Sequence, residues 1–392
     1  MKRFKSATQV FSQGLLLCLL LCGCITEYEA KDLENITDIL VVDGIITDNE
    51  SVITLSRSKS LTYEDNPLDR SPYYVTDANV YIERDDGMQW SAAGQNSGQY
   101  TIETEKLNPE RQYRLKIEFE ANEYCSEFAY PMETPEIDSV FWSKRGTEQP
   151  VSIYVATHAP ENEVLYYRWW YREEWEMRAN YISEDTGSCP ECMAFVDLKD
   201  IFCPNCGFEL TRYPYYCWHS TFNSEILPGS SEKTVSGRVA EKLTEMPSAD
   251  NKLAILYRID VRQNVISKRA YDYYANVKKN AQQTGGLFAH VPMEMKGNIS
   301  CVTDPLRKTI GYVDVSSSSI KRRYISRKDG VYERPPRLCE EMSSYQLYLQ
   351  FGNIPPSYIF VANHGYVHAL CVDCTYGGGT KYRPADWPDD EF

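Results

Sequence analysis

The sequence has no hydrophobic run long enough to cross a bilayer as a helix. Its most apolar stretch, Leu15 to Leu21, ends at Gly23-Cys24 and is followed by polar residues, whereas a transmembrane helix needs about 20 consecutive apolar residues. Basic residues precede this stretch and none lies within it. This order is typical of a secretory signal peptide, which we expect to span residues 1–23 and to be removed.

Positive charge is also scarce. The chain has 41 Lys and Arg against 56 Asp and Glu, which gives a net charge of −15, and loss of residues 1–23 with their three basic side chains makes it −18. Binding to phosphates needs a concentrated basic surface. The acidic balance therefore argues against nucleic acid as a partner.

The familiar motifs of catalytic sites are missing. There is no Gly-x-Ser-x-Gly elbow, phosphate-binding loop, dinucleotide fingerprint or haem-attachment sequence. Only five histidines occur, and they are scattered: His158, His219, His290, His364 and His368. Acidic residues are so abundant that many pairs could serve as the acid and base of a hydrolase. We predict no catalytic residue, and a hydrolase with an unrecognised carboxylate site remains an alternative.

The end of the leader suggests a membrane anchor. Leu21-Cys22-Gly23-Cys24 resembles the bacterial lipobox, in which the cysteine thiol receives diacylglycerol and the new amino group receives a further chain such as palmitate. More than one chain gives stable anchoring. Residue 25 is Ile, not the Asp that signals inner-membrane retention. We expect a lipoprotein of the outer membrane that faces the periplasm or the cell surface; a plain signal peptide is the alternative.

Four cysteines form two short motifs in an insert at about residues 185–210. Cys189-Pro190-Glu191-Cys192 and Cys203-Pro204-Asn205-Cys206 have the spacing of zinc knuckles, and the second is followed by Gly207. Two knuckles supply four thiolates to one tetrahedral ion, so we predict a zinc-ribbon-like insert with one structural zinc. Disulfides, which exported proteins commonly form, and thiol redox chemistry are the alternatives.

Six further cysteines are candidates for disulfides. We expect Cys371 and Cys374 to pair with members of the remaining set, which comprises Cys125, Cys217, Cys301 and Cys339. A mixed histidine and cysteine metal site, with His364 and His368 just upstream, is the alternative for the Cys371-Val372-Asp373-Cys374 motif.

The rest of the chain predicts β structure in two domains. Residues 24–130 contain short alternating segments that favour an Ig-like or transthyretin-like sandwich: 39–44, 51–55, 78–84, 99–103 and 113–119, with a turn at Asp85-Asp86-Gly87. Two prolines at 131 and 135 mark a boundary. Residues 136–392 predict a larger β-rich domain with strands near 137–142, 151–156, 166–171, 252–263, 310–315 and 358–362.

One helix is expected in this second domain. Apolar residues between Ser267 and Gln282 recur at offsets of three, four, seven and eleven, Ser267 can cap the first turn, and Gly285-Gly286 can end the helix. We expect it to pack against the second sandwich. The acidic tail from Asp386 to Phe392 is expected to be frayed.

Several short motifs together resemble a known family. They are Val42-Asp43-Gly44, Pro135 to Val140, Cys217-Trp218, Ile266 to Tyr274, Gly285 to Phe288, Gly297 to Ile299, Gly311 to Val313, Cys371 to Thr375 and Gly377 to Thr380. In this order they are similar to the Bacteroidetes lipoproteins grouped as domain of unknown function 4249. The resemblance implies a largely β, outer-membrane or periplasm-facing lipoprotein that is often encoded beside TonB-dependent receptors; it implies no catalytic residue.

The leading functional hypothesis is a non-enzymatic accessory or ligand-binding partner of a TonB-dependent nutrient transporter. A structural or adhesive surface lipoprotein is the second hypothesis, and the hydrolase is the third. Apart from the zinc, no cofactor is expected.

Overall fold

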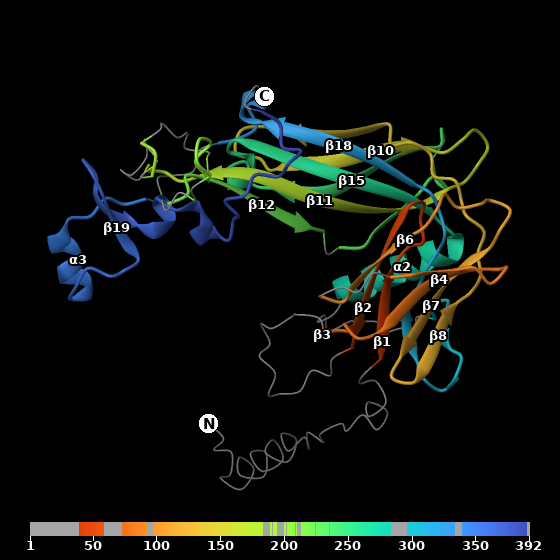
Figure 1. The fold of residues 1–392 in the computed structure, drawn as a ribbon. Coiled ribbons are helices and arrows are strands. Elements are labelled where there is room, and N and C mark those ends of the chain that lie inside the picture. Colours follow the sequence, from red (N-terminus) through yellow and green to blue (C-terminus); the bar gives the residue numbers. More distant parts are fainter. Residues whose placement is uncertain are drawn as a thin grey trace, which may run out of the picture.

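The computed structural model describes residues 39–58, 73–92, 97–182, 189, 191–193, 200, 202–207, 209, 213–223, 225–234, 236–283, 296–333 and 339–389. The signal peptide, Cys24, His290 and the Gly285-Gly286 helix stop lie outside these ranges. The described chain is mainly β, as expected, and forms two sandwiches side by side with a smaller lobe at one end (Figure 1).

The N-terminal sandwich contains two five-stranded sheets. One has the order β17-β1-β2-β3, with β6 paired to β2, and the other has the order β16-β8-β7-β4-β5. The strands from the first part of the chain are β1 Leu40–Gly44, β2 Glu50–Arg57, β3 Tyr73–Tyr74, β4 Asn79–Arg84, β5 Gln89–Ser91, β6 Gln99–Glu103, β7 Tyr113–Phe119 and β8 Asn122–Ser126. In β7 every second residue is buried, because side chains alternate across a sheet.

Two strands of this sandwich come from much later in the chain. β16 Ile299–Cys301 pairs antiparallel with β8, and β17 Thr309–Gly311 pairs parallel with β1. A Cβ on Gly311 would lie 2.3 Å from the carbonyl oxygen of Val42, so the close approach of β17 requires glycine there. The sandwich is therefore not built from residues 24–130 alone.

The second sandwich combines a three-stranded sheet, β14-β10-β9, with the sheet β12-β11-β15-β18, in which β13 also pairs with β11. Its strands are β9 Ser139–Lys144, β10 Val151–His158, β11 Tyr166–Arg178, β12 Tyr216–Phe222, β13 Leu227–Ser230, β14 Arg238–Met246, β15 Leu256–Ile266 and β18 Ser318–Ser326. Trp169, Tyr257 and Ile259 are fully buried between these sheets. Alternation places them on the inner face.

The predicted helix is α2, Lys268–Gln283. The Ser267 hydroxyl accepts a hydrogen bond from the Ala270 amide at 3.1 Å, as expected of an N-cap. Its buried residues pack with Tyr166 and Trp170 of β11 and also with Ile45 and Tyr312 beside the N-terminal sandwich. The helix therefore helps to join the two sandwiches.

A buried arginine lies in the same junction. The Arg168 guanidinium stacks between the rings of Trp170 and Tyr274, at 4.2 and 4.1 Å from their centres, and pairs with Asp43 of β1 at 2.7 Å. Contact with two aromatic faces and one carboxylate stabilises a charge that burial would otherwise penalise.

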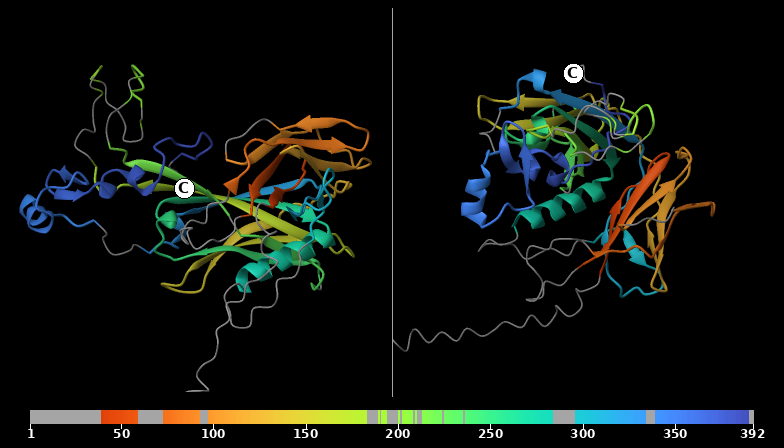
Figure 2. Two further views of the ribbon diagram at one scale, coloured as in Figure 1. Left: turned by 90° about the horizontal axis from the view of Figure 1, so that it is seen from below. Right: turned by 60° about the vertical axis from the view of Figure 1, so that its left-hand side comes forward.

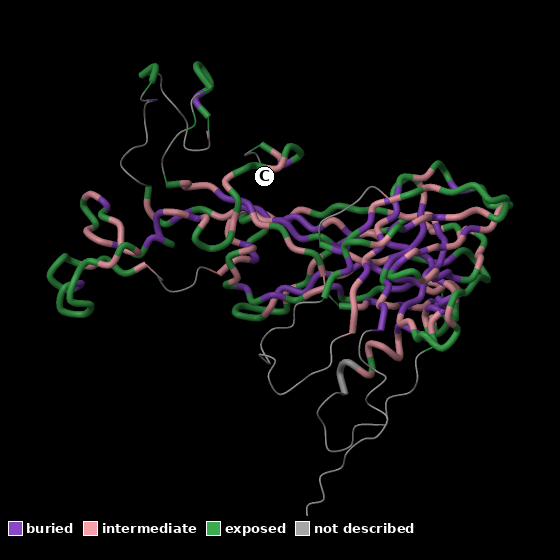
Figure 3. The backbone as a smooth tube through the Cα atoms, turned by 60° about the horizontal axis from the view of Figure 1, so that its bottom comes forward, coloured by how far each residue is buried: buried purple, intermediate pink, exposed green. Residues whose placement is uncertain are grey.

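The C-terminal lobe, residues 339–372, contains a helix that the sequence analysis missed. α3 Ser344–Phe351 precedes the hairpin of β19 Tyr358–Val361 and β20 Gly365–His368. Its core is small and consists of Val361, Val367, Cys371 and Val372 with a few partly buried neighbours. Figures 1 and 3 show the lobe at the end of the second sandwich remote from the N-terminal sandwich, with much of it exposed.

The described part of the acidic tail is anchored, so the expectation that it frays is wrong there. Trp387 is buried with Trp218 and Leu256, and its ring lies 5.3 Å from the Arg258 guanidinium. Asp386 pairs with Arg258 at 3.0 Å and with Arg322 at 2.9 Å.

Candidate metal centre

Four cysteine sulfurs converge in the insert between β11 and β12. The ligand atoms of Cys189, Cys192, Cys203 and Cys206 all lie within 4.8 Å of one another. Across the two motifs, the Sγ atoms of Cys189 and Cys206 are 3.5 Å apart and those of Cys192 and Cys203 are 3.4 Å apart. Sulfurs bound at about 2.3 Å to one tetrahedral ion are about 3.8 Å apart, and disulfide sulfurs are about 2.05 Å apart. The cluster could hold a metal ion.

Both motifs turn the backbone in the same way. The amide of Met193 donates to the carbonyl of Cys189 at 2.8 Å, and the amide of Gly207 donates to the carbonyl of Cys203 at 2.8 Å. Met193 and Gly207, one residue after each second cysteine, both have left-handed backbones, with φ of 56° and 72°. In the first knuckle Met193 therefore adopts the left-handed backbone that glycine adopts in the second.

The environment of Cys203 favours a thiolate. Burial raises the pKa of its thiol, but hydrogen bonds from the backbone amides of Asn205 and Cys206 and from the Cys192 thiol outweigh it and lower the pKa to about 7. Amides that point at sulfur stabilise its negative charge. A thiolate near neutral pH is the form that binds a metal.

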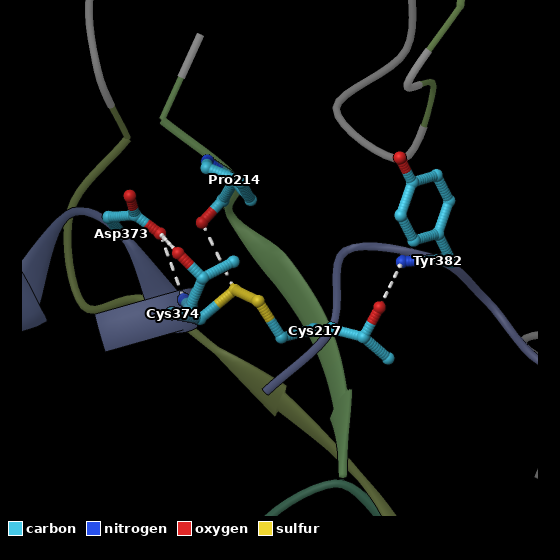
Figure 4. The surroundings of a disulfide bond; sticks show 7 residues. Pro214, Cys217, Asp373, Cys374 and Tyr382 are labelled. Atoms are coloured by element: carbon cyan, nitrogen blue, oxygen red, sulfur yellow. Dashed lines mark hydrogen bonds between the residues drawn. A yellow bond between two sulfur atoms is a disulfide. The ribbon is translucent and has the colours of Figure 1, made fainter. Parts of the chain in front are cut away.

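The stem of this insert is attached to the C-terminal segment. The Ala179 amide donates to the carbonyl of Tyr215, which closes the two strands of the stem at 2.9 Å. A disulfide joins Cys217 at the start of β12 to Cys374 (Figure 4). The Cys374 amide donates to the carbonyl of Pro214. The described parts of the insert project beyond β11 and β12 (Figure 2). The disulfide therefore holds a projecting unit at its base.

The second disulfide links the ends of the C-terminal lobe. It joins Cys339 to Cys371, so Cys371 and Cys374 both pair with members of the expected set. Cys125 and Cys301, also expected among the candidates, have free thiols. They lie on the adjacent strands β8 and β16, but Cys301 is opposite Tyr124 and Cys125 is opposite Ser300. Because neighbouring positions of a strand face opposite sides, these two sulfurs cannot meet.

The alternative metal site near the C-terminus is ruled out by the same bonds. Cys371 and Cys374 are both in disulfides. His364 Nδ1 contacts the Glu341 carboxylate at 2.8 Å, and His368 Nδ1 accepts from the Leu370 amide at 3.2 Å. The two histidines therefore serve a contact with a carboxylate and a helix cap.

A depression among the described residues has residue types that are common in catalytic sites. It has a volume of about 470 Å³ and is lined by Asp138, His158, Ser236 and Arg238. Asp138 holds His158 through Nδ1, at 2.7 and 2.9 Å from its two oxygens. The depression contains one carboxylate, so it does not provide the pair of acids that a glycosidase-like hydrolase requires.

Comparison with known proteins adds a family and little else. The model of the family described as Domain of unknown function (DUF4249) matches residues 25–322. The insert lies within this range, whereas the Cys371 to Thr375 motif that contributed to the resemblance lies beyond it. No curated protein matches the chain. None of the helices in the described part is both long and apolar enough to span a membrane.

Similarity to solved structures is weak. A DUF4785 family protein from Legionella pneumophila has 11% identity and a TM-score of 0.16, with 58% of this chain and 51% of that chain covered. A structure of manganese lipoxygenase of Gaeumannomyces graminis with part of zonadhesin of Komagataella pastoris has 9% identity and a TM-score of 0.15, with 59% and 90% covered. This chain spans about half the length of the first. At these scores neither structure indicates a function.

Proposed function

This chain belongs to the DUF4249 family, and from that premise we propose that it is an outer-membrane lipoprotein, a non-enzymatic accessory or ligand-binding partner of a TonB-dependent nutrient transporter. The observation that carries the proposal is the lipobox Leu21-Cys22-Gly23-Cys24 behind a short apolar leader. Lipid on Cys24 would hold the protein at the membrane, with the −18 charge of the mature chain in the aqueous phase. The link to a transporter rests on the TonB-dependent receptors that are often encoded beside members of the family, which is an argument by analogy.

The arrangement of the described parts supports a binding role. The cysteine insert and the C-terminal lobe both lie at the end of the second sandwich remote from the N-terminal sandwich (Figures 1 and 3). Each is fixed by a disulfide, Cys217–Cys374 at the stem of the insert and Cys339–Cys371 in the lobe. Segments that are held in place before binding lose less conformational entropy when a partner binds.

Zinc in the four-cysteine cluster is part of this proposal. A set of four thiolates suits zinc, and it leaves no open coordination position for a substrate. The ion would therefore stabilise the insert and would not be catalytic. Elemental analysis of the purified mature protein should find about one zinc per chain; Cys203→Ser should lose it, whereas Cys125→Ser should keep it. Absence of metal together with no free thiols in the insert would refute the zinc site.

The transporter proposal can be tested in native membranes. The full chain with a C-terminal tag is gently solubilised and purified, and the bound proteins are identified by mass spectrometry. Recovery of one TonB-dependent receptor at comparable abundance is expected, and the Cys24→Ala variant, which cannot be acylated, should lose it. Recovery of the chain alone, also after chemical cross-linking, would favour the structural or adhesive alternative.

Incorporation of labelled palmitate tests the anchor separately. The wild-type chain should carry the label and Cys24→Ala should not. An unlabelled wild-type chain would refute the lipoprotein assignment.

A further inference from the structure

The short helix α3 has apolar side chains on two opposite faces. Leu347 is fully buried. Tyr345, Tyr348 and Leu349 are 68%, 63% and 66% exposed. Residues three and four apart on a helix are neighbours, so these three form one outward surface, which lies opposite Leu347.

This outward surface belongs to an uncharged segment. Between Met342 and Val372 the sequence has no Asp, Glu, Lys or Arg, although 25% of the whole chain is charged. The same segment exposes four further large apolar side chains, which are Phe351, Ile354, Phe360 and Leu370. Monomeric soluble proteins rarely leave such surfaces uncovered without a function. An acidic protein therefore presents one neutral, aromatic and aliphatic face.

We propose that this α3 surface, formed by Tyr345, Tyr348 and Leu349, docks on the lipid surface of the membrane to which the protein is anchored. Tyrosine and leucine suit the boundary between headgroups and acyl chains, where a ring can be buried while its hydroxyl stays hydrated. Charged side chains are costly there, which accounts for their absence from the segment. The mode of binding is apolar insertion and involves no attraction between basic side chains and anionic lipids.

The length of the chain between the anchor and the fold favours the lipid surface as the occupant. This inference rests on the lipid anchor of the proposed function. Fourteen residues, 25 to 38, lie between Cys24 and the first described residue, Ile39, and the fifteen steps from Cα to Cα reach at most about 50 Å. The tether keeps the fold close to one bilayer, and such confinement gives even a weak surface contact a high effective concentration.

The test uses the mature chain, residues 24–392, with Cys24→Ser so that no lipid is attached. The probe is a vesicle of phosphatidylethanolamine and phosphatidylglycerol, and binding is measured by co-sedimentation. The parent chain should partition onto vesicles, with little change in 1 M NaCl. The double variant Tyr348→Ser/Leu349→Ser should reduce the partition coefficient at least tenfold. Amide exchange in α3 should slow when vesicles are added to the parent chain.

A matched control distinguishes binding through this surface from non-specific binding through other exposed apolar side chains. Leu306 is 90% exposed and Tyr130 is 56% exposed, and both lie outside the C-terminal lobe. The double variant Tyr130→Ser/Leu306→Ser should bind vesicles like the parent. Equal binding by the two double variants, or no binding by the parent, would overturn the inference.

The remaining outcomes distinguish this inference from the proposed function. Palmitate labelling without vesicle binding would refute the docking surface and leave the anchor intact. Vesicle binding that depends on Tyr348, in a chain that carries no palmitate in cells, would support the docking surface and refute the lipid anchor. A photo-crosslinker at position 348 that captures one receptor in native membranes, from a chain that does not bind vesicles, would assign the surface to a protein partner.

Discussion

Removal of the Cys339–Cys371 disulfide should unfold the C-terminal lobe and leave both sandwiches folded. The lobe has a core cluster of four buried residues with a few partly buried neighbours, and Leu347 and Ala369 are buried besides. This is a small core for a segment of this length. The disulfide spans a sequence separation of 32, and the loop-entropy relation gives about 3.7 kcal/mol for such a loop. Loss of this constraint should therefore increase the local opening constant about 500-fold.

The assay is amide hydrogen exchange on the double variant Cys339→Ser/Cys371→Ser, under conditions in which exchange reports the opening equilibrium. Amides of α3, β19 and β20 should exchange faster by up to that factor, whereas those of β7 and β15 should be unchanged. Cys125→Ala, which removes a buried free thiol, controls for the loss of a cysteine as such. Unchanged exchange in the lobe, or equal acceleration in all three regions, would show that the lobe is not held separately by this bond.

Three further predictions concern other parts of the molecule. Met193→Gly should tighten metal binding about fivefold in a chelator competition, because glycine adopts the left-handed backbone of Met193 at about 1 kcal/mol less cost; no tightening would mean that the first knuckle is not strained. Hydrogen bonding with Arg258 and Arg322 lowers the pKa of Asp386. The stability that its charged carboxylate adds to the folded tail is therefore present above the ordinary pKa and is lost as the pH falls below about 4. Asp386→Asn should therefore loosen Trp387 already at pH 7, seen as a fluorescence change that Asp389→Asn does not reproduce. Gly229→Ala should destabilise the second sandwich by about 1–3 kcal/mol in urea unfolding, because the new Cβ would lie 2.4 Å from the Trp169 ring; Gly146→Ala, whose nearest neighbour is 3.8 Å away, should change little.

Sequence patterns among neighbouring residues predicted the strands and the helix whose form depends on those residues. The strand at 113–119 and the helix from Ser267 onward were expected and are present, because alternation and helical periodicity are read directly from neighbouring residues. The helix α3 was missed. Its apolar residues lie on two opposite faces, so the single stripe that identifies an amphipathic helix is absent.

For the cysteines too, the sequence predicted one part of the arrangement and the tertiary structure decided the rest. The two Cys-x-x-Cys motifs and their spacing indicated four sulfurs that could share an ion, and the structure brings those four together. The partners of the remaining six cysteines were left open among fifteen arrangements. Strand register decided that Cys125 and Cys301 face opposite sides of one sheet.

The sequence by itself determined the β class and the family and predicted the leader, its lipobox and the cysteine cluster, because each is recognised from short motifs of neighbouring residues. Only the tertiary structure decided that β16 and β17 return to the N-terminal sandwich, that Trp387 anchors the tail, and that Tyr345, Tyr348 and Leu349 face solvent. These features depend on contacts between distant segments. The free energy of such contacts comes from surfaces that exist only after the chain has folded.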